Sequence, residues 1–138
     1  MKLKAGLVAL VPFALLLGAC SSSPATEIDV TTTDFAFSDE SWTVAADEDI
    51  TINLTNDGDV THEFVILQDG VKVTSEADFP ETEEELLADF VEWEEEIESG
   101  DSGTFTFPAL PAGTYQVVCA IENHFDAGMN ARLIVEAP

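Results

Sequence analysis

Basic residues are scarce in this sequence. Only four Lys and Arg stand against 28 Asp and Glu in 138 residues, which gives a formal net charge of −24. A body of this charge repels phosphate backbones and anionic lipid headgroups, so nucleic-acid binding is not expected. The charge suits either a basic partner protein or a solution of high salt.

Long hydrophobic runs are also absent after the first 19 residues. These read "MKLKAGLVALVPFALLLGA", in which Lys2 and Lys4 precede an apolar run that ends in small residues. The run is too short to span a bilayer comfortably, so residues 1–19 are predicted to be an export signal, with an uncleaved anchor as the alternative. Its loss would leave Lys72 and Arg132 as the basic residues.

The junction "LGAC" at residues 17–20 resembles the lipobox of bacterial-type lipoproteins. The resemblance implies that Cys20 becomes the new N-terminus and carries lipid, which places the protein on the outer face of the cytoplasmic membrane or the periplasmic side. Residues 20–27 would then form a lipid-anchored polar tether, and residues 28–138 one domain. An ordinary cleaved signal, with Cys20 incidental, is the alternative.

Cysteine, histidine and methionine are rare, with two of each in the chain. Without Met1 and Cys20, four such residues remain: His62, Cys119, His124 and Met129. Taken singly, each has an ordinary interpretation, as a strand histidine, a buried thiol or a core methionine. An exported protein rarely leaves a thiol idle, so Cys119 is expected to be either buried and inert or bound to something.

Most of the chain alternates apolar and polar residues with the two-residue period of half-buried strands. Turn signals such as "NDG" at 56–58 and "PAG" at 111–113 separate the runs. Seven or eight short strands of this kind predict an all-β fold, a two-sheet antiparallel Greek-key sandwich. The runs are "EIDVTTT", "DFAFSDESWTVAA", "DITINLTN", "THEFVIL", "GTFTFPAL", "GTYQVVCA" and "NARLIVEA".

One segment, residues 76–98, has helical rather than strand spacing. Its apolar residues include Leu86, Phe90, Trp93 and Ile97, and Thr82 with a Glu three residues later forms a capping-box pattern. We therefore expect one inserted acidic helix across residues 76–98, whose apolar stripe covers an edge of the sandwich.

The four rare residues together indicate copper chemistry. A thiolate and two imidazoles in a trigonal arrangement, with a weak axial thioether, form a blue-copper electron-transfer site. Cys119 ends one predicted strand and Met129 begins the next, so residues 120–128 form one loop at a pole of the sandwich, with His124 inside it. His62 must reach the same pole from a distant strand. In a heterologous expression host, zinc is the alternative to copper at the same four ligands.

The segments "NDGDVTHEFVI" and "AGTYQVVCAIENHFDAGMNARLIV" resemble the two ligand segments of the cupredoxins. The resemblance covers roughly residues 35–135 and implies one copper ion bound by His62, Cys119, His124 and Met129. It also implies that the ring edge of His124 faces solvent, with Phe125 and its neighbours as an apolar docking patch.

The sequence departs from the family pattern beside the ligands. Glu63 follows the first His, where many members have Asn, and Glu122-Asn123 replaces Pro-Gly before the second His, whereas the Asn56 lead-in is kept. Acid beside the copper should favour Cu(II) and lower the reduction potential. We therefore expect Glu122→Gln to raise the potential, and voltammetry that finds it unchanged or lower would contradict this.

The predicted function is one-electron transfer by a membrane-tethered monomer that is not an enzyme, because both histidines are used as ligands and no Ser-His-Asp arrangement or phosphate loop is visible. Its partners would be redox proteins, such as a cytochrome or a membrane redox complex. Storage or delivery of copper is the alternative, and an interaction module with incidental copper is a third. The acidic surface is interpreted as high-salt adaptation rather than a docking face, because acid is spread through most segments.

Overall fold

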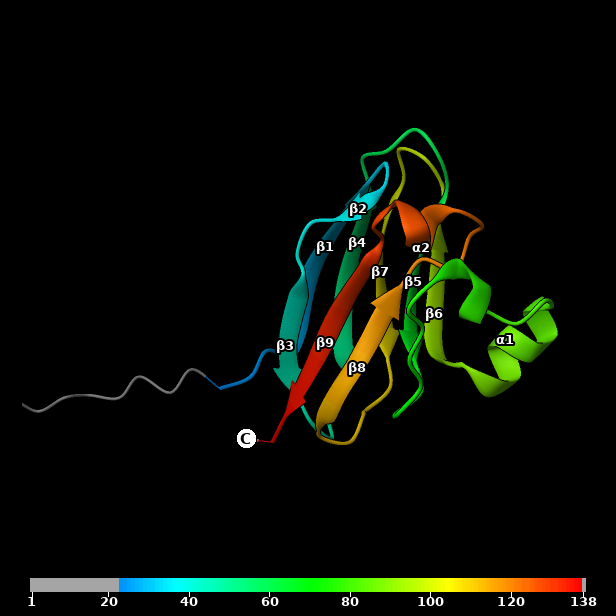
Figure 1. Ribbon diagram of the computed structural model, residues 1–138. Helices are drawn as coiled ribbons and strands as arrows, with labels where there is room; N and C mark the ends of the chain where they lie inside the picture. Colours follow the sequence, from blue (N-terminus) through cyan, green and yellow to red (C-terminus); the bar gives the residue numbers. More distant parts are fainter. Residues whose placement is uncertain (1–22, 138) are drawn as a thin grey trace, which may run out of the picture.

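The computed structural model describes residues 23–137, which form a sandwich of two β-sheets with a short helical insertion at one side (Figure 1). One sheet has the strand order β2-β1-β4-β7 and the other β3-β9-β8-β5-β6. The strands are β1 (Glu27–Thr33), β2 (Ala36–Phe37), β3 (Ser41–Ala45), β4 (Ile50–Asn56), β5 (His62–Leu67), β6 (Val91–Ile97), β7 (Ser102–Phe107), β8 (Gly113–Val118) and β9 (Asn130–Glu136). The helices are η1 (Glu76–Asp78), α1 (Glu83–Asp89) and α2 (His124–Ala127).

The sheets are mixed rather than purely antiparallel. β1 pairs in parallel with β4, and β3 pairs in parallel with β9, whereas the other pairs are antiparallel. The parallel pairing of β3 follows from the run "DFAFSDESWTVAA", which does not form one strand. It divides into β2 in the first sheet and β3 in the second, so the chain crosses between the sheets there and enters the second sheet alongside β9.

The main core lies between the sheets, and β5 has a second core on its outer face. Phe64 and Ile66 point into the sandwich, whereas Val65 and Leu67 pack in a separate cluster with Phe125 and others. Segment 71–90 covers this outer cluster with Val71, Phe79 and Phe90, among others. Burial of both faces explains why "HEFVIL" reads as continuously apolar instead of alternating.

The prediction of one helix across residues 76–98 is wrong over most of its length, because the α-helix covers only Glu83–Asp89 and is preceded by the separate 3-10 helix η1. The helix α1 ends at Asp89, and residues 91–97 form strand β6, which pairs antiparallel with β5. Val91, Trp93 and Ile97 also satisfy a period of two, and their partner strand decides between the two periods. The predicted cap is confirmed, since the Thr82 hydroxyl accepts a hydrogen bond from the Glu85 N–H at 3.2 Å, and α1 begins directly after it at Glu83.

The predicted export signal and Cys20 lie outside the described residues. Within the predicted tether, Ala25 forms a bridge with Val44, and the Thr51 N–H donates to the Thr26 carbonyl at 2.9 Å. Glu27 already begins β1. Across residues 23–137, no helix has the length and apolar character needed to cross a membrane.

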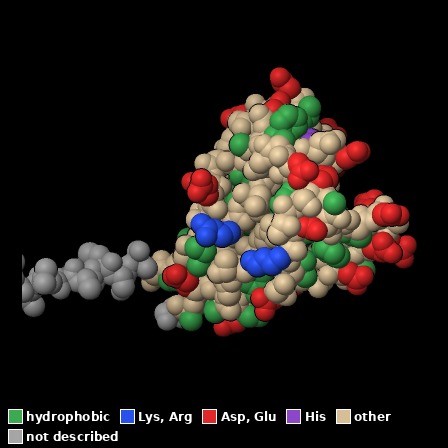
Figure 2. All heavy atoms as spheres, in the orientation of Figure 1, with side chains coloured by type: hydrophobic (Ala, Val, Ile, Leu, Met, Phe, Trp, Pro, Cys, Tyr) green, Lys and Arg blue, Asp and Glu red, His purple; other side chains and the backbone are tan. Residues whose placement is uncertain are grey.

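Acidic side chains are spread over the visible face of the molecule, and they also gather around the projecting α1 region (Figure 2). The two basic side chains of the described chain, Lys72 and Arg132, lie on that face too and line one shallow hollow between them.

Candidate metal centre

One loop between two paired strands carries three of the predicted ligands. Cys119 directly follows β8, and Met129 directly precedes β9. Because β8 and β9 are antiparallel, the loop ends meet, and the Cys119 N–H donates to the Met129 carbonyl at 3.2 Å. His124 begins the short helix α2 between them, and the Met129 N–H donates to its carbonyl at 3.1 Å.

The first residue of β5 brings the fourth predicted ligand to the same pole. His62 Nδ1 lies 3.3 Å from His124 Nδ1, and Cys119 Sγ also lies 3.3 Å from His124 Nδ1. All three ligand atoms lie within 4.8 Å of one another, and all three residues are buried. Met129 is fully buried, and its backbone hydrogen bonds to Cys119 and His124 tie it to this cluster.

These separations fit one metal ion. Metal–nitrogen bonds of about 2.0–2.1 Å and a metal–sulfur bond of about 2.3 Å place the ligand atoms of a trigonal ion about 3.5–3.8 Å apart. The two measured separations of 3.3 Å are close to that. One thiolate and two imidazoles, with a buried thioether nearby, are the donor set that a type 1 copper ion takes.

Burial sets the protonation of the ligands in the metal-free protein. It raises the pKa of the Cys119 thiol to about 11. It lowers the pKa of His124, and the neighbouring His62 lowers it further. At neutral pH the imidazole of His124 is therefore neutral and ready to bind, whereas Cys119 must release a proton to a bound cation.

Glu63 contacts the site through its backbone. Its N–H donates to Cys119 Sγ at 3.4 Å, which supports negative charge on the sulfur. Its side chain points away from the core on the outer face of β5, directly opposite Glu96 of β6. Burial raises the pKa of Glu63 to about 7, with the charge of Glu94 as the next cause. The negative charge expected beside the copper is therefore incomplete at neutral pH.

Asn56, the last residue of β4, bonds both to the loop that leads to His62 and to the end of β6. Its side-chain amide donates to the carbonyls of Val60 at 2.8 Å and Ile97 at 3.0 Å, and its Oδ1 accepts from the Gly58 N–H at 2.9 Å. The side chain is fully buried, and Ile97 lies opposite His62 in the sheet. Asn56 thus holds the β4–β5 loop in the shape that delivers His62 to the pole.

The position of Phe125 differs from the prediction. Phe125 is buried, and its ring packs edge-on against Phe79 at a centroid distance of 5.6 Å, so it belongs to the outer core and not to a docking patch. Glu122 and Asn123 are exposed on the ligand loop, as a surface role requires. The Asn123 N–H donates to Glu76 Oε1 at 2.9 Å, which ties the loop to the insertion.

Two residues that the sequence analysis did not single out, Asp34 and Phe35, cover the site from the β1–β2 turn. Asp34 Oδ1 lies 3.0 Å from His62 Nε2, and the Asp59 N–H donates to Asp34 Oδ2 at 2.9 Å. That backbone contact chiefly lowers the pKa of Asp34 below 3.8, so the group is a carboxylate at neutral pH. No local pattern could reveal this contact, because it joins residues 28 positions apart in different sheets.

The Phe35 ring replaces the expected apolar cover of His124. Its centroid lies 4.8 Å from that of His124, and Phe35 is 40% exposed whereas His124 is 7% exposed. The Gly128 φ of 129° is a conformation that side chains rarely adopt, and a Cβ there would meet the Phe35 carbonyl at 3.5 Å. Figure 2 shows a small histidine surface beside hydrophobic side chains at this end of the molecule.

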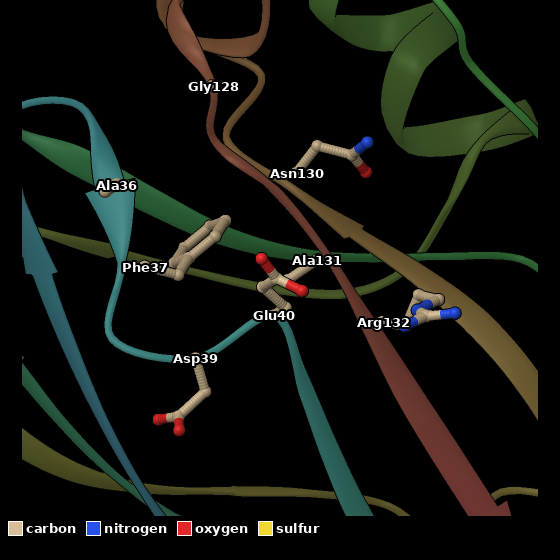
Figure 3. A pocket seen from close by; sticks show the side chains of 8 residues that line it. All are labelled: Ala36, Phe37, Asp39, Glu40, Gly128, Asn130, Ala131 and Arg132. Atoms are coloured by element: carbon tan, nitrogen blue, oxygen red, sulfur yellow. The ribbon is translucent and has the colours of Figure 1, made fainter.

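A surface hollow between β2 and β9 is separate from the four predicted ligands (Figure 3). Its lining residues are Ala36, Phe37, Asp39, Glu40, Gly128, Asn130, Ala131 and Arg132. None of these residues is a histidine or a cysteine. The hollow is therefore no part of the candidate metal centre, whose His62, Cys119 and His124 are buried.

The chain belongs to the cupredoxin-like domain family, whose model matches residues 6–135. The fold is similar to reduced auracyanin from Roseiflexus castenholzii (21% identity, TM-score 0.65, covering 83% of this chain and 99% of that one). It is also similar to auracyanin A, a "blue" copper protein from Chloroflexus aurantiacus (21%, TM-score 0.61, covering 83% and 100%), and to auracyanin B (23%, TM-score 0.61, covering 83% and 91%). No curated protein sequence matches the chain.

Proposed function

We propose that this protein is a one-electron carrier with a single type 1 copper ion held by His62, Cys119, His124 and Met129. The observation that carries the proposal is a buried cluster in which one ring nitrogen of His62, one of His124 and Cys119 Sγ lie within 4.8 Å of one another, with His124 Nδ1 3.3 Å from both of the others. The bound ion would supply the Cu(I)/Cu(II) couple. The chain supplies the rest, which is a fixed ligand geometry and exclusion of water.

The proposed route for the electron runs through His124 and Phe35. His124 Nδ1 lies 3.3 Å from Cys119 Sγ, and the half-exposed Phe35 ring packs edge-on against the His124 ring. Phe35 and Val60 are among the few exposed large hydrophobic residues, at 40% and 39%. A small apolar patch of this kind suits brief contact with a redox partner, which needs fast release more than affinity.

The Phe35 patch is tested by Phe35→Ala, with Leu87→Ala as a matched control. Leu87 is 41% exposed on α1 and does not belong to the site. We expect Phe35→Ala to slow electron exchange with a cytochrome, measured by stopped flow, and to leave the copper spectrum in place. Equal rates for the two variants would contradict a docking role for Phe35.

Copper storage or delivery uses the same ligands, and exchange kinetics separate the two functions. An electron carrier keeps its copper over many redox cycles, so electron exchange must be much faster than copper loss. Stopped-flow electron exchange and copper transfer to a chelator, measured on one sample, give both rates. Copper loss faster than electron exchange would favour the copper-handling function. A sample that shows no thiolate-to-copper absorption after addition of Cu(II) would overturn both.

We further propose that the carrier works outside the cytoplasmic membrane, tethered through lipid on Cys20, with residues 1–19 removed. The support is the sequence pattern "LGAC" after a short apolar run. Mass spectrometry of the mature protein from a bacterial host tests this. Replacement of Cys20 by Ser should release the protein from the membrane fraction.

A further inference from the structure

We propose that Asp34 is the positioning residue of the copper site, whose carboxylate fixes the His62 tautomer and favours the oxidised ion. The inference rests on the proposed function for its redox part, but the contact itself belongs to the metal-free chain. Asp34 Oδ1 lies 3.0 Å from His62 Nε2, and the Asp34 side chain is 27% exposed.

The chemistry of the contact assigns the hydrogen. An ionised carboxylate only accepts hydrogen bonds, so His62 Nε2 must carry the hydrogen that joins them. In the neutral ring, Nδ1 then has a free lone pair. That atom is the one that faces His124 Nδ1 at 3.3 Å and completes the candidate ligand cluster. Asp34 therefore selects the tautomer that the metal site needs.

The carboxylate also changes the strength of the ligand. A histidine that donates its second N–H to a carboxylate becomes a more basic ligand, and more basic nitrogen favours the more highly charged ion. Asp34 adds a negative charge close to the cluster, which acts in the same direction. Both effects stabilise Cu(II) relative to Cu(I) and lower the reduction potential.

The neighbouring loop is built to admit Asp34. The Asp59 N–H donates to Asp34 Oδ2 at 2.9 Å, so both carboxylate oxygens are occupied. A Cβ placed on Gly58 would overlap Asp34 Oδ1. The glycine of the "NDG" segment thus leaves room for the carboxylate to reach His62, and Gly58→Ala should displace it.

The first experiment is potentiometry of the copper-loaded protein with Asp34→Asn, using Asp59→Asn as the control. Each change removes one negative charge from the same pole, and Asp59→Asn keeps the backbone N–H that Asp34 accepts. We expect Asp34→Asn to raise the reduction potential clearly more than Asp59→Asn. Equal shifts in the two variants would overturn the proposal, because Asp34 would then act only as a distant charge.

The second experiment needs no copper. Nitrogen-15 NMR of the metal-free protein should show His62 as a single Nε2-protonated tautomer. In Asp34→Ala or Gly58→Ala the Nδ1-protonated form should appear; if Asp34→Ala does not fold, Gly58→Ala carries the test. Unchanged His62 shifts in every folded variant would overturn the proposal. A wild-type protein that binds no copper, but shows the expected tautomer, would overturn the proposed function and the redox part of the inference, and would leave the role of Asp34 in fixing the tautomer.

Discussion

Asn56→Ala should destabilise the fold far more than an equivalent change elsewhere on the same strand. The substitution removes three hydrogen bonds from a fully buried side chain, those to Val60, Ile97 and Gly58. The Ile97 carbonyl is left in a buried position, which costs about 1–3 kcal/mol, and the two part-buried groups add about 0.5–1.5 kcal/mol each. We expect a loss of about 3 kcal/mol in the free energy of unfolding.

Asn53 of the same strand β4 is the matched control. Its side chain also makes three hydrogen bonds, donating to Glu27 at 2.7 Å and Asp29 at 2.9 Å and accepting from Thr104 at 2.9 Å. These bonds are exposed, so water replaces the lost partner, and Asn53→Ala should cost about 1 kcal/mol or less.

The assay is urea unfolding of the metal-free protein, followed by tryptophan fluorescence, for wild type and both variants. The slope with urea should be unchanged, so that the midpoint reports stability. Costs for Asn56→Ala and Asn53→Ala that agree within about 0.5 kcal/mol would refute the reasoning, because burial would then not control the cost of a lost hydrogen bond. Because Asn56 shapes the loop before His62, its loss should also weaken metal binding more than the loss of Asn53.

Three further predictions concern charge and the insertion. Raising the salt concentration to about 1 M shortens the screening length to about 3 Å, so it should raise the urea midpoint of unfolding. Glu96→Gln should reduce this response to salt, because Glu96 lies opposite Glu63 in the sheet. If salt does not stabilise the protein, high-salt adaptation is refuted. Backbone and hydroxyl hydrogen bonds lower the pKa of Asp78 below 3.8. The stability that the Asp78 carboxylate contributes is therefore present above that pH and is lost as the pH falls through its folded-state pKa. Unfolding free energies of Asp78→Asn and wild type, measured at several pH values, should converge in acid, and a constant difference would contradict this. Glu76→Ala removes the acceptor of the Asn123 N–H, a hydrogen bond that contributes about 1 kcal/mol, so copper should dissociate several-fold faster into a chelator. An unchanged rate of dissociation would show that the insertion does not hold the ligand loop.

The ligands were predictable because their residue types are rare and their spacing is local. Cys119, His124 and Met129 share one loop between two clearly alternating strands, so the loop ends had to meet. The structure adds His62 at the start of a strand, as the distant fourth member expected at the same pole. A further reason to group them was that Cys119 would lack a disulfide partner if Cys20 carries lipid, as the sequence predicts.

The second half of the predicted helix failed because its residues satisfy two periods. Val91, Trp93 and Ile97 fit a helical stripe together with Leu86 and Phe90, and they also lie at even spacing along a strand. Glutamate favours helix, so local propensity pointed the wrong way. The exposed edge of β5 decided the outcome by offering a partner strand, and such long-range pairing is invisible in a local pattern.

Two of the three supports of the metal site, Asp34 and Glu76, were beyond sequence analysis for the same reason, whereas Asn56 was named there as part of the lead-in to His62. Asp34 reaches His62 from the β1–β2 turn, Asn56 holds the β4–β5 loop, and Glu76 of the insertion binds the loop that carries His124. Three separate parts of the chain therefore fix a cluster to which none of them contributes a ligand. A one-electron carrier requires ligands that stay in place when the charge of the ion changes, and supports of independent origin provide that, because movement of one leaves the other two in contact with the site. The loss of any single support should therefore alter affinity or potential while the cluster itself still forms, and this separates the supports from the ligands by experiment.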